Sequence, residues 1–205
     1  MTTIDAMGKP CPIPVIETKK ILAKPDEDSV LVKVDNIVAV QNLEKMAKGY
    51  AYGFSYVERG KGSFDVLISK NGKSPPGAEA IDDVAVTVQD GGLPGKLVVA
   101  IGRDTMGDGA EELGKILIKG FIYSLTELST PPDSLLFFNS GAYLTSDGSS
   151  TVDDLKRLEA KGTEIFSCGT CINFYGLQDR LAVGTIADMY KITQKLASAG
   201  NIINI

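Results

Sequence analysis

Three cysteines are the residues best suited to covalent chemistry in this chain of 205 residues. The chain contains no histidine, which excludes Ser-His and Cys-His catalysis. Three thiols are too few to close a tetrahedral zinc site within one chain, and their odd number argues against a disulfide framework. The sequence therefore predicts thiol chemistry in a reducing compartment, with no metal and no cofactor.

The first cysteine, Cys11, is followed by Pro12 and Pro14 and then by apolar residues at helical spacing. Proline fits a first helical turn, where its missing N–H is not needed, so Cys11 is expected at or beside a helix N-cap. Unpaired N–H groups and the helix dipole favour the reactive thiolate there, and also the terminal anion of a persulfide or perselenide. The alternative is a small buried apolar residue that merely precedes a helix.

The other two cysteines, Cys168 and Cys171, form a C-x-x-C pair between a predicted strand and a predicted helix. This arrangement suits redox or relay chemistry because the two sulfurs can meet. We assign Cys171 as the nucleophile, with a pKa lowered by the helix end, and Cys168 as the resolving or accepting partner; Gly169 belongs to the same turn. Two alternatives stay open, a half zinc site shared across a dimer and two inert cysteines at a strand end.

Two further segments follow predicted strands. The segment Asn139, Ser140 and Gly141 is expected on the same rim as Cys168, where its backbone N–H groups could hold a sulfur anion. A loop that does not bind a sulfur anion fits the sequence equally well. The glycine-rich segment 102–109 matches neither a Walker A motif nor a G-x-G-x-x-G motif, and a tight strand-to-helix turn is its expected role.

The order of predicted elements divides the chain in two. Residues 1–70 carry strands at 3–7, 29–35, 54–58 and 63–69 and helices after Cys11 and at 37–52, a β-α-β-α-β-β pattern typical of a two-layer sandwich. Residues 71–95 are rich in glycine and proline and predict a linker, which encloses a short apolar stretch at 84–88.

Residues 96–205 alternate strands with helices. Strands are expected at 97–101, 135–138, 164–167 and 201–205, and helices at 107–128, 152–160, 174–181 and 187–197. The apolar positions of the first of these helices are Leu113, Ile116, Leu117, Phe121 and Leu125. The pattern predicts a doubly wound, mainly parallel α/β sheet. Ligands of such sheets bind beyond the carboxyl ends of the strands, where Cys168 is expected.

Composition sets further bounds. Hydrophobic residues make up 43% of the chain and charged residues 23%, as expected of a globular protein. A net charge of −5 argues against binding to nucleic acid. No apolar run is long enough to cross a membrane, and the first residues lack the pattern of a signal peptide, so we expect a cytoplasmic location.

The motif Cys11-Pro12-Ile13-Pro14 within a β-α-β-α-β-β unit resembles the TusA (SirA-like) sulfur carriers. Residues 96–205 resemble the DsrE-like sulfur-relay subunits, whose reactive cysteine corresponds to Cys171. The combination is similar to the YedF proteins of selenium metabolism. This resemblance implies a donor such as a cysteine desulfurase or selenocysteine lyase, a downstream acceptor protein, a link to selenophosphate synthesis, and homo-oligomers formed through the DsrE-like domain.

Three functions fit these observations. The first is a sulfurtransferase-like carrier that relays a persulfide or perselenide from Cys11 to Cys171, with release through Cys168. The second is a thiol-disulfide oxidoreductase that uses only the C-x-x-C pair. The third is a non-enzymatic module that binds a partner protein.

Overall fold

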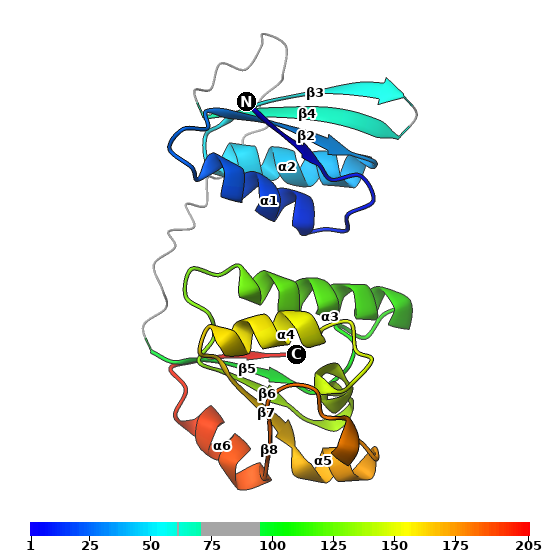
Figure 1. Ribbon diagram of the computed structural model, residues 1–205, viewed down its shortest axis with the longest axis vertical. Coiled ribbons are helices and arrows are strands. Elements are labelled where there is room, and N and C mark those ends of the chain that lie inside the picture. The colour runs from blue at the N-terminus through cyan, green and yellow to red at the C-terminus, as the bar shows by residue number, and fades with distance from the viewer. Residues whose placement is uncertain (61, 71–94) are drawn as a thin grey trace. The chain divides into compact units, whose positions relative to one another are not determined.

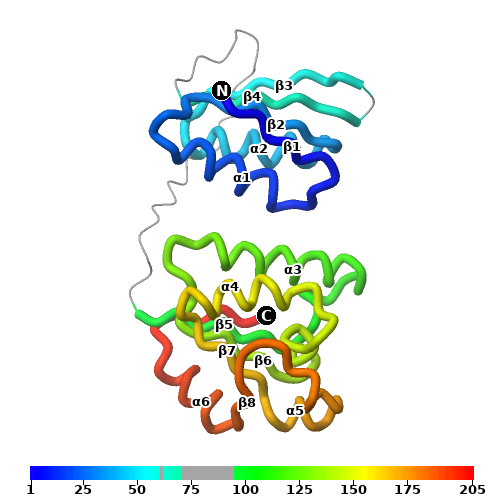
Figure 2. Tube along the Cα trace, in the orientation of Figure 1, coloured from blue at the N-terminus to red at the C-terminus, as the bar shows by residue number. Residues whose placement is uncertain are grey.

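The computed structural model describes residues 1–60, 62–70 and 95–205 (Figure 1). The chain forms two compact units, Met1–Gln89 and Asp90–Ile205. The predicted linker 71–95, except residue 95, and the apolar stretch 84–88 lie outside the described residues. The path of the chain within each unit can be followed in Figure 2.

The first unit has the predicted β-α-β-α-β-β order. Its elements are β1 (Thr2–Asp5), α1 (Ile13–Leu22), β2 (Ser29–Val34), α2 (Ile37–Gly49), β3 (Gly53–Gly60) and β4 (Ser63–Ser69). The strands form one sheet in the order β1-β2-β4-β3, in which only the β1–β2 pair is parallel. Both helices cover one face of this sheet (Figure 1).

Alternation along the strands builds the core of the first unit. Strand β2 buries Val30, Val32 and Val34, and β4 buries Phe64, Val66 and Ile68, because successive side chains of a strand point to opposite faces. Helix α2 packs on this face with Val40, Leu43 and Ala47, among other residues. The predicted two-layer sandwich is confirmed.

The second unit is a parallel sheet with helices on both faces (Figure 1). The sheet runs β8-β7-β6-β5-β9, and all four strand pairs are parallel. The strands are β5 (Leu97–Ile101), β6 (Ser134–Phe137), β7 (Glu164–Cys168), β8 (Thr185–Ala187) and β9 (Asn201–Asn204). The helices are α3 (Glu111–Thr126), α4 (Val152–Ala160), α5 (Gly169–Phe174) and α6 (Met189–Ala197), with 3₁₀ turns η1 (Asn139–Thr145) and η2 (Gln178–Arg180). The predicted doubly wound sheet is confirmed.

The buried face of helix α3 is not the face that the sequence predicted. The prediction was based on five apolar positions, and most of these are not buried. Of those positions only Leu125 is buried, while Leu113, Ile116 and Leu117 are 53%, 57% and 44% exposed. The buried residues are Gly114, Ile118, Ile122, Leu125 and Thr126. This helix is apolar on more than one side, so periodicity alone does not select the packed face. Position 114 needs a glycine because a Cβ there would stand only 2.8 Å from Cβ of Thr105.

The predicted helix at 174–181 is wrong. Helix α5 begins at Gly169, directly after β7, and ends at Phe174; Gly176 then has a φ of 64°, and only the short turn η2 follows. Glycine adopts this left-handed conformation without the steric cost that a Cβ brings, so it stops the helix early. The strand β8 was also missed, because three residues are too few to give a period. These corrections move Cys171 into the first turn of α5.

Candidate functional site: the cysteine thiols

Cys11 is an exposed thiol directly before a helix. It lies in the turn between β1 and α1, and Pro12 is the N-cap of α1, whose carbonyl accepts the N–H of Ile16 at 3.1 Å. The side chain of Asn42 on α2 donates from Nδ2 to Cys11 Sγ at 3.4 Å. Pro14 is buried in the first turn. The two prolines occupy the helix-start positions where the sequence predicts them, and the thiol faces solvent.

A small cavity of about 60 Å³ adjoins Cys11. Pro10, Asn36 and Val38 contribute to its wall. Lys9 also lines it, but its ammonium group is bonded to Glu17 at 2.8 Å. The space suits the terminal atom of a persulfide or perselenide better than a cofactor, because cofactor sites are several times larger.

Cys168 and Cys171 lie together at the carboxyl end of β7. Cys168 is the last residue of that strand and the N-cap of α5, and its side chain is 1% exposed. Cys171 is half-buried and lies in the first turn of α5. The Cys168 thiol raises the pKa of the Cys171 thiol, so the two side chains lie near each other. They belong to one site with an accessible and a buried sulfur.

The backbone of Asn139 donates its N–H to Cys171 Sγ at 3.0 Å. Asn139 follows β6 and has a φ of 49°, a left-handed conformation that asparagine tolerates better than most residues. Its side-chain Oδ1 accepts the hydroxyl hydrogen of Tyr175 at 2.8 Å. The segment after β6 therefore reaches the sulfur with a backbone donor, as the sequence suggested, and Tyr175 holds that segment from α5.

Ser140 lies in η1 and Gly169 is the first residue of α5, in the two turns beside the thiol pair. The Ser140 hydroxyl accepts the backbone N–H of Asp104 at 3.2 Å, which ties η1 to the loop after β5. A Cβ on Gly169 would lie 3.0 Å from Cγ2 of Ile186 on β8. Both residues serve the packing of the turns around the thiol pair. The loop 102–109 joins β5 to α3, with Arg103 paired to Asp108.

The expected low pKa of Cys171 is wrong. Burial raises the pKa of the Cys171 thiol, the Asn139 N–H lowers it, and the neighbouring Cys168 raises it, with a net shift upward. The sequence-based expectation considered the helix end and omitted the loss of water around the sulfur. In the resting protein Cys171 is therefore a thiol at neutral pH.

This shift has a direct test. Because a raised pKa delays thiolate formation, alkylation of Cys171 by iodoacetamide is expected to accelerate only at a pH above that at which the same cysteine reacts in the urea-unfolded chain. Peptide mass spectrometry after a timed pulse at each pH gives the two profiles. A folded-state midpoint at or below the unfolded one would contradict the predicted shift.

Gly141 is needed where η1 passes the end of β5. A Cβ at this position would stand 2.3 Å from the carbonyl oxygen of Ile101, a backbone atom that cannot move aside. We expect Gly141→Ala to lower the free energy of unfolding by about 1–3 kcal/mol, as for other overpacked sites. Gly109→Ala, with no atom within 4 Å of the added Cβ, is the matched control. Chemical denaturation of both variants measures the difference; equal stability would refute the close approach.

The structure joins Cys168, Cys171 and Asn139 in one site, and Cys11 belongs to the other unit. Sequence reasoning missed Asn42 and Tyr175, because neither belongs to a motif: Asn42 reaches Cys11 from α2, and Tyr175 caps the C-terminal end of α5. Among residues 1–60, 62–70 and 95–205, no group of three or more His, Cys, Asp or Glu side chains could hold a metal ion. In the same ranges, no helix is long and apolar enough to span a membrane.

An exposed thiol at the start of a helix, on a two-layer α/β sandwich, defines a candidate thiol carrier. Residues 2–70 match the family model for the sulfurtransferase TusA. A candidate sulfur carrier protein of Methanocaldococcus jannaschii is 32% identical over 71 residues, which are 34% of this chain and 95% of the relative. Through this part of its sequence, the chain belongs to the TusA family of sulfur carriers.

Three solved structures resemble portions of the chain. The SirA-like protein from Desulfitobacterium hafniense is 49% identical and covers 34% of this chain and 96% of its own, with a TM-score of 0.32. The ychN protein from E. coli is 16% identical and covers 54% of this chain and 98% of its own, with a TM-score of 0.44. A protein of unknown function from Methanobacterium thermoautotrophicum is also 16% identical with the same coverage, at a TM-score of 0.42.

Proposed function

We propose that this protein carries sulfur or selenium as a persulfide or perselenide, first on Cys11 and then on Cys171. The observation that carries this proposal is the exposed Cys11 thiol at the start of α1 in a domain of the TusA family. A solvent-facing thiol beside a helix N-terminus can be reached by a donor protein, and the backbone N–H groups there favour sulfur in its anionic form.

The first step is an exchange at Cys11. A donor persulfide gives its terminal sulfur to the Cys11 thiol, so that a new S–S bond forms on Cys11 as the donor's S–S bond breaks. The donor is left as a thiol, and the number of protons and electrons is unchanged. Asn42 Nδ2, at 3.4 Å from Sγ, donates a hydrogen bond that helps to hold the sulfur in place.

The second step moves the terminal sulfur from Cys11 to Cys171 by the same exchange. Because Cys171 rests as a thiol, its attack requires that its proton be lost, and the proton returns to Cys11 as that residue becomes a thiol again. The Asn139 N–H, 3.0 Å from Cys171 Sγ, then stabilises negative charge on the sulfur.

The third step is release through Cys168. The Cys168 thiol attacks the inner sulfur of the Cys171 persulfide, and a Cys168–Cys171 disulfide forms as the terminal sulfur leaves as sulfide. The carried sulfur atom gains two electrons and the two cysteines lose them. The buried position of Cys168 and its effect on the pKa of Cys171 support this role, because both indicate that the two sulfurs are neighbours.

The wider assignment rests on resemblance. We propose residues 1–70 as the carrier domain, 71–95 as the linker and 96–205 as a DsrE-like domain, the arrangement of the YedF proteins of selenium metabolism. The donor is then a cysteine desulfurase or a selenocysteine lyase, and an acceptor protein follows. We also propose a cytoplasmic location and homo-oligomers formed through the DsrE-like domain. The three free cysteines support a reducing compartment.

Incubation with a cysteine desulfurase and cysteine tests the carrier function. Intact mass spectrometry is expected to show the full chain heavier by one sulfur atom, and treatment with a reductant should restore the original mass. Repetition with selenocysteine and a selenocysteine lyase separates the two cargoes. A chain that stays unmodified with both donors would refute the proposal.

A further inference from the structure

Tyr175 contacts both parts of the Cys171 site, and the proposed exchange steps do not use it. It is the C-cap residue of α5, and its backbone N–H donates to the carbonyl oxygen of Cys171 at 3.0 Å. Its hydroxyl group donates to Oδ1 of Asn139 at 2.8 Å. Tyr175 therefore links the helix that carries the sulfur to the segment that carries the hydrogen-bond donor.

Three hydrogen bonds at this site form a closed cycle. The Asn139 N–H donates to Cys171 Sγ at 3.0 Å, the Asn139 side chain accepts the hydroxyl hydrogen of Tyr175, and the Tyr175 backbone donates to the Cys171 carbonyl. Because each bond restricts the geometry of the next, the position of the donor N–H at the sulfur depends on the Tyr175 hydroxyl as well as on the sheet.

The Tyr175 hydroxyl holds Asn139 from the side of α5. Asn139 has a left-handed φ of 49°, a conformation that costs free energy in any residue with a Cβ. The residues that follow it are held from the side of β5, since the Ser140 hydroxyl accepts the N–H of Asp104 and Gly141 lies against the carbonyl of Ile101. The bond to Tyr175 thus complements anchors that do not reach toward the sulfur.

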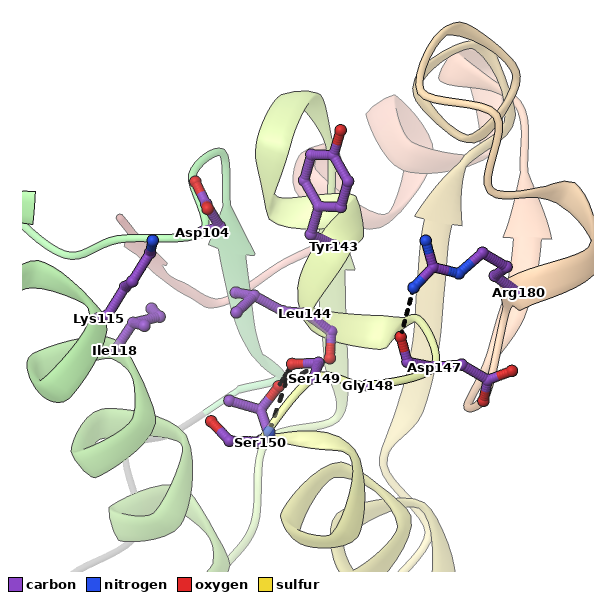
Figure 3. Close-up of a pocket in the computed structure, with 11 residues that line it drawn as sticks. Asp104, Lys115, Ile118, Tyr143, Leu144, Asp147, Gly148, Ser149, Ser150 and Arg180 are labelled. Carbon is purple, nitrogen blue, oxygen red and sulfur yellow. Dashed lines mark hydrogen bonds between the residues drawn. The ribbon is translucent and has the colours of Figure 1, made fainter. Parts of the chain in front are cut away.

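Aromatic packing fixes the ring of Tyr175. The ring centroids of Tyr143 and Phe174 lie 4.9 Å and 5.0 Å from that of Tyr175. Tyr143 also lines a cavity of about 370 Å³, and Figure 3 shows its hydroxyl group directed away from Leu144. Ring contacts of this kind do not need the hydroxyl group, so they should persist when Tyr175 is replaced by phenylalanine.

We propose that Tyr175 is a positioning residue for Cys171: its hydroxyl holds Asn139 so that the Asn139 N–H stays at the sulfur and favours the thiolate. A hydrogen bond to an ionised acceptor is stronger than one to a neutral acceptor, so this donor acts mainly on the anion. It opposes burial and the Cys168 thiol, which both raise the pKa of Cys171.

The thiolate matters twice in an exchange at Cys171. It is the form that attacks a persulfide, and it is the form in which Cys171 leaves when the carried sulfur moves on. The importance of Tyr175 for sulfur transfer therefore rests on the proposed function. Its effect on the ionisation of the thiol does not, and can be measured without any sulfur donor.

Tyr175→Phe tests the hydroxyl group alone. Alkylation of Cys171 by iodoacetamide at neutral pH, followed by peptide mass spectrometry, should be about three- to tenfold slower than in the wild type, as expected from partial loss of a charge-assisted hydrogen bond. The difference should narrow as the pH rises and the thiol ionises in both proteins. A change in access to the sulfur would instead slow the reaction by the same factor at every pH and would overturn the proposal.

Two further variants make the test specific. Tyr143→Phe removes a hydroxyl that has no hydrogen bond within the described part of the chain, from a ring packed on Tyr175, and should react like the wild type. Asn139→Gly keeps the left-handed conformation and the N–H but removes the acceptor, so it should match Tyr175→Phe.

The double variant of Tyr175→Phe and Asn139→Gly should react no more slowly than Tyr175→Phe, because both changes remove the same bond. Chemical denaturation checks that every variant is folded. Unaltered alkylation in Tyr175→Phe, an equal loss in Tyr143→Phe, or effects that multiply in the double variant would overturn the positioning role.

Sulfur transfer tests the consequence separately. With a desulfurase and cysteine, Tyr175→Phe should load Cys11 at the wild-type rate, because Cys11 belongs to the other unit, and the persulfide on Cys171 should appear more slowly. Transfer to Cys171 at the wild-type rate would overturn the role of Tyr175 in this step. If wild-type Cys11 gains no sulfur, the carrier function fails, and the alkylation rates still decide whether Tyr175 positions the donor.

Discussion

Replacement of Cys11 by serine is expected to abolish entry of sulfur into the protein. A serine hydroxyl is not ionised at neutral pH and forms no persulfide, so the chain should gain no sulfur from a desulfurase, at Cys11 or at Cys171. The loss should be of the order of a thousandfold or more in loading rate, as for removal of other covalent nucleophiles. Intact mass spectrometry after timed incubation measures it.

The stability of the Cys11→Ser variant is the control for this experiment. Cys11 is exposed and lies before α1 rather than in the core, so Cys11→Ser should leave the unfolding transition within about 0.5 kcal/mol of the wild type. A variant that folds normally and still acquires sulfur at the wild-type rate would remove Cys11 as the point of entry. Asn42→Ala, which deletes only the hydrogen bond to the sulfur, should slow loading without abolishing it.

Replacement of Cys168 by serine is expected to separate loading from release. The persulfide on Cys171 can then form but cannot be resolved, because no other described cysteine belongs to this unit. Sulfide release in the absence of added thiols should fall at least about a hundredfold, while a stable extra sulfur accumulates on Cys171. Methylene-blue detection of sulfide and peptide mass spectrometry give the two readings.

The alternative outcome is equally informative. If Cys168→Ser releases sulfide as fast as the wild type, then Cys168 does not resolve the persulfide and serves packing alone. Its role would then be to fill the core at the end of β7, where 1% of its side chain is exposed. Wild-type protein treated with the donor in excess should form the Cys168–Cys171 disulfide, which provides the positive control.

Much of the fold could be predicted because the strands show clear patterns. The continuous apolar run 97–101 became the buried strand β5, and the alternation at 63–69 became β4 with every second residue in the core. Local patterns of this kind depend on burial, which the residue types report directly. The choice of face for α3 depends on Gly114 passing close to Thr105, a tertiary contact that no local pattern reveals.

The site was less accessible to prediction. The position of Cys11 before a helix follows from proline chemistry, and the rim shared by Cys168 and Asn139 follows from the parallel sheet. The direction of the Cys171 pKa shift does not follow from the sequence, because it depends on how much water the fold removes from the sulfur. The start of α5 at Gly169 was missed for a different reason: the helix is only six residues long, which is too short to show a helical period.

The order in which the cysteines carry the sulfur tests the central claim most directly. Full-length protein is mixed with a desulfurase and cysteine, quenched by alkylation at successive times, and digested for peptide mass spectrometry. We expect the persulfide on the Cys11 peptide to rise first and to decline as the one on the Cys171 peptide appears. Sulfur that appears on Cys171 before Cys11, or at an undiminished rate in Cys11→Ser, would contradict a relay that begins at Cys11.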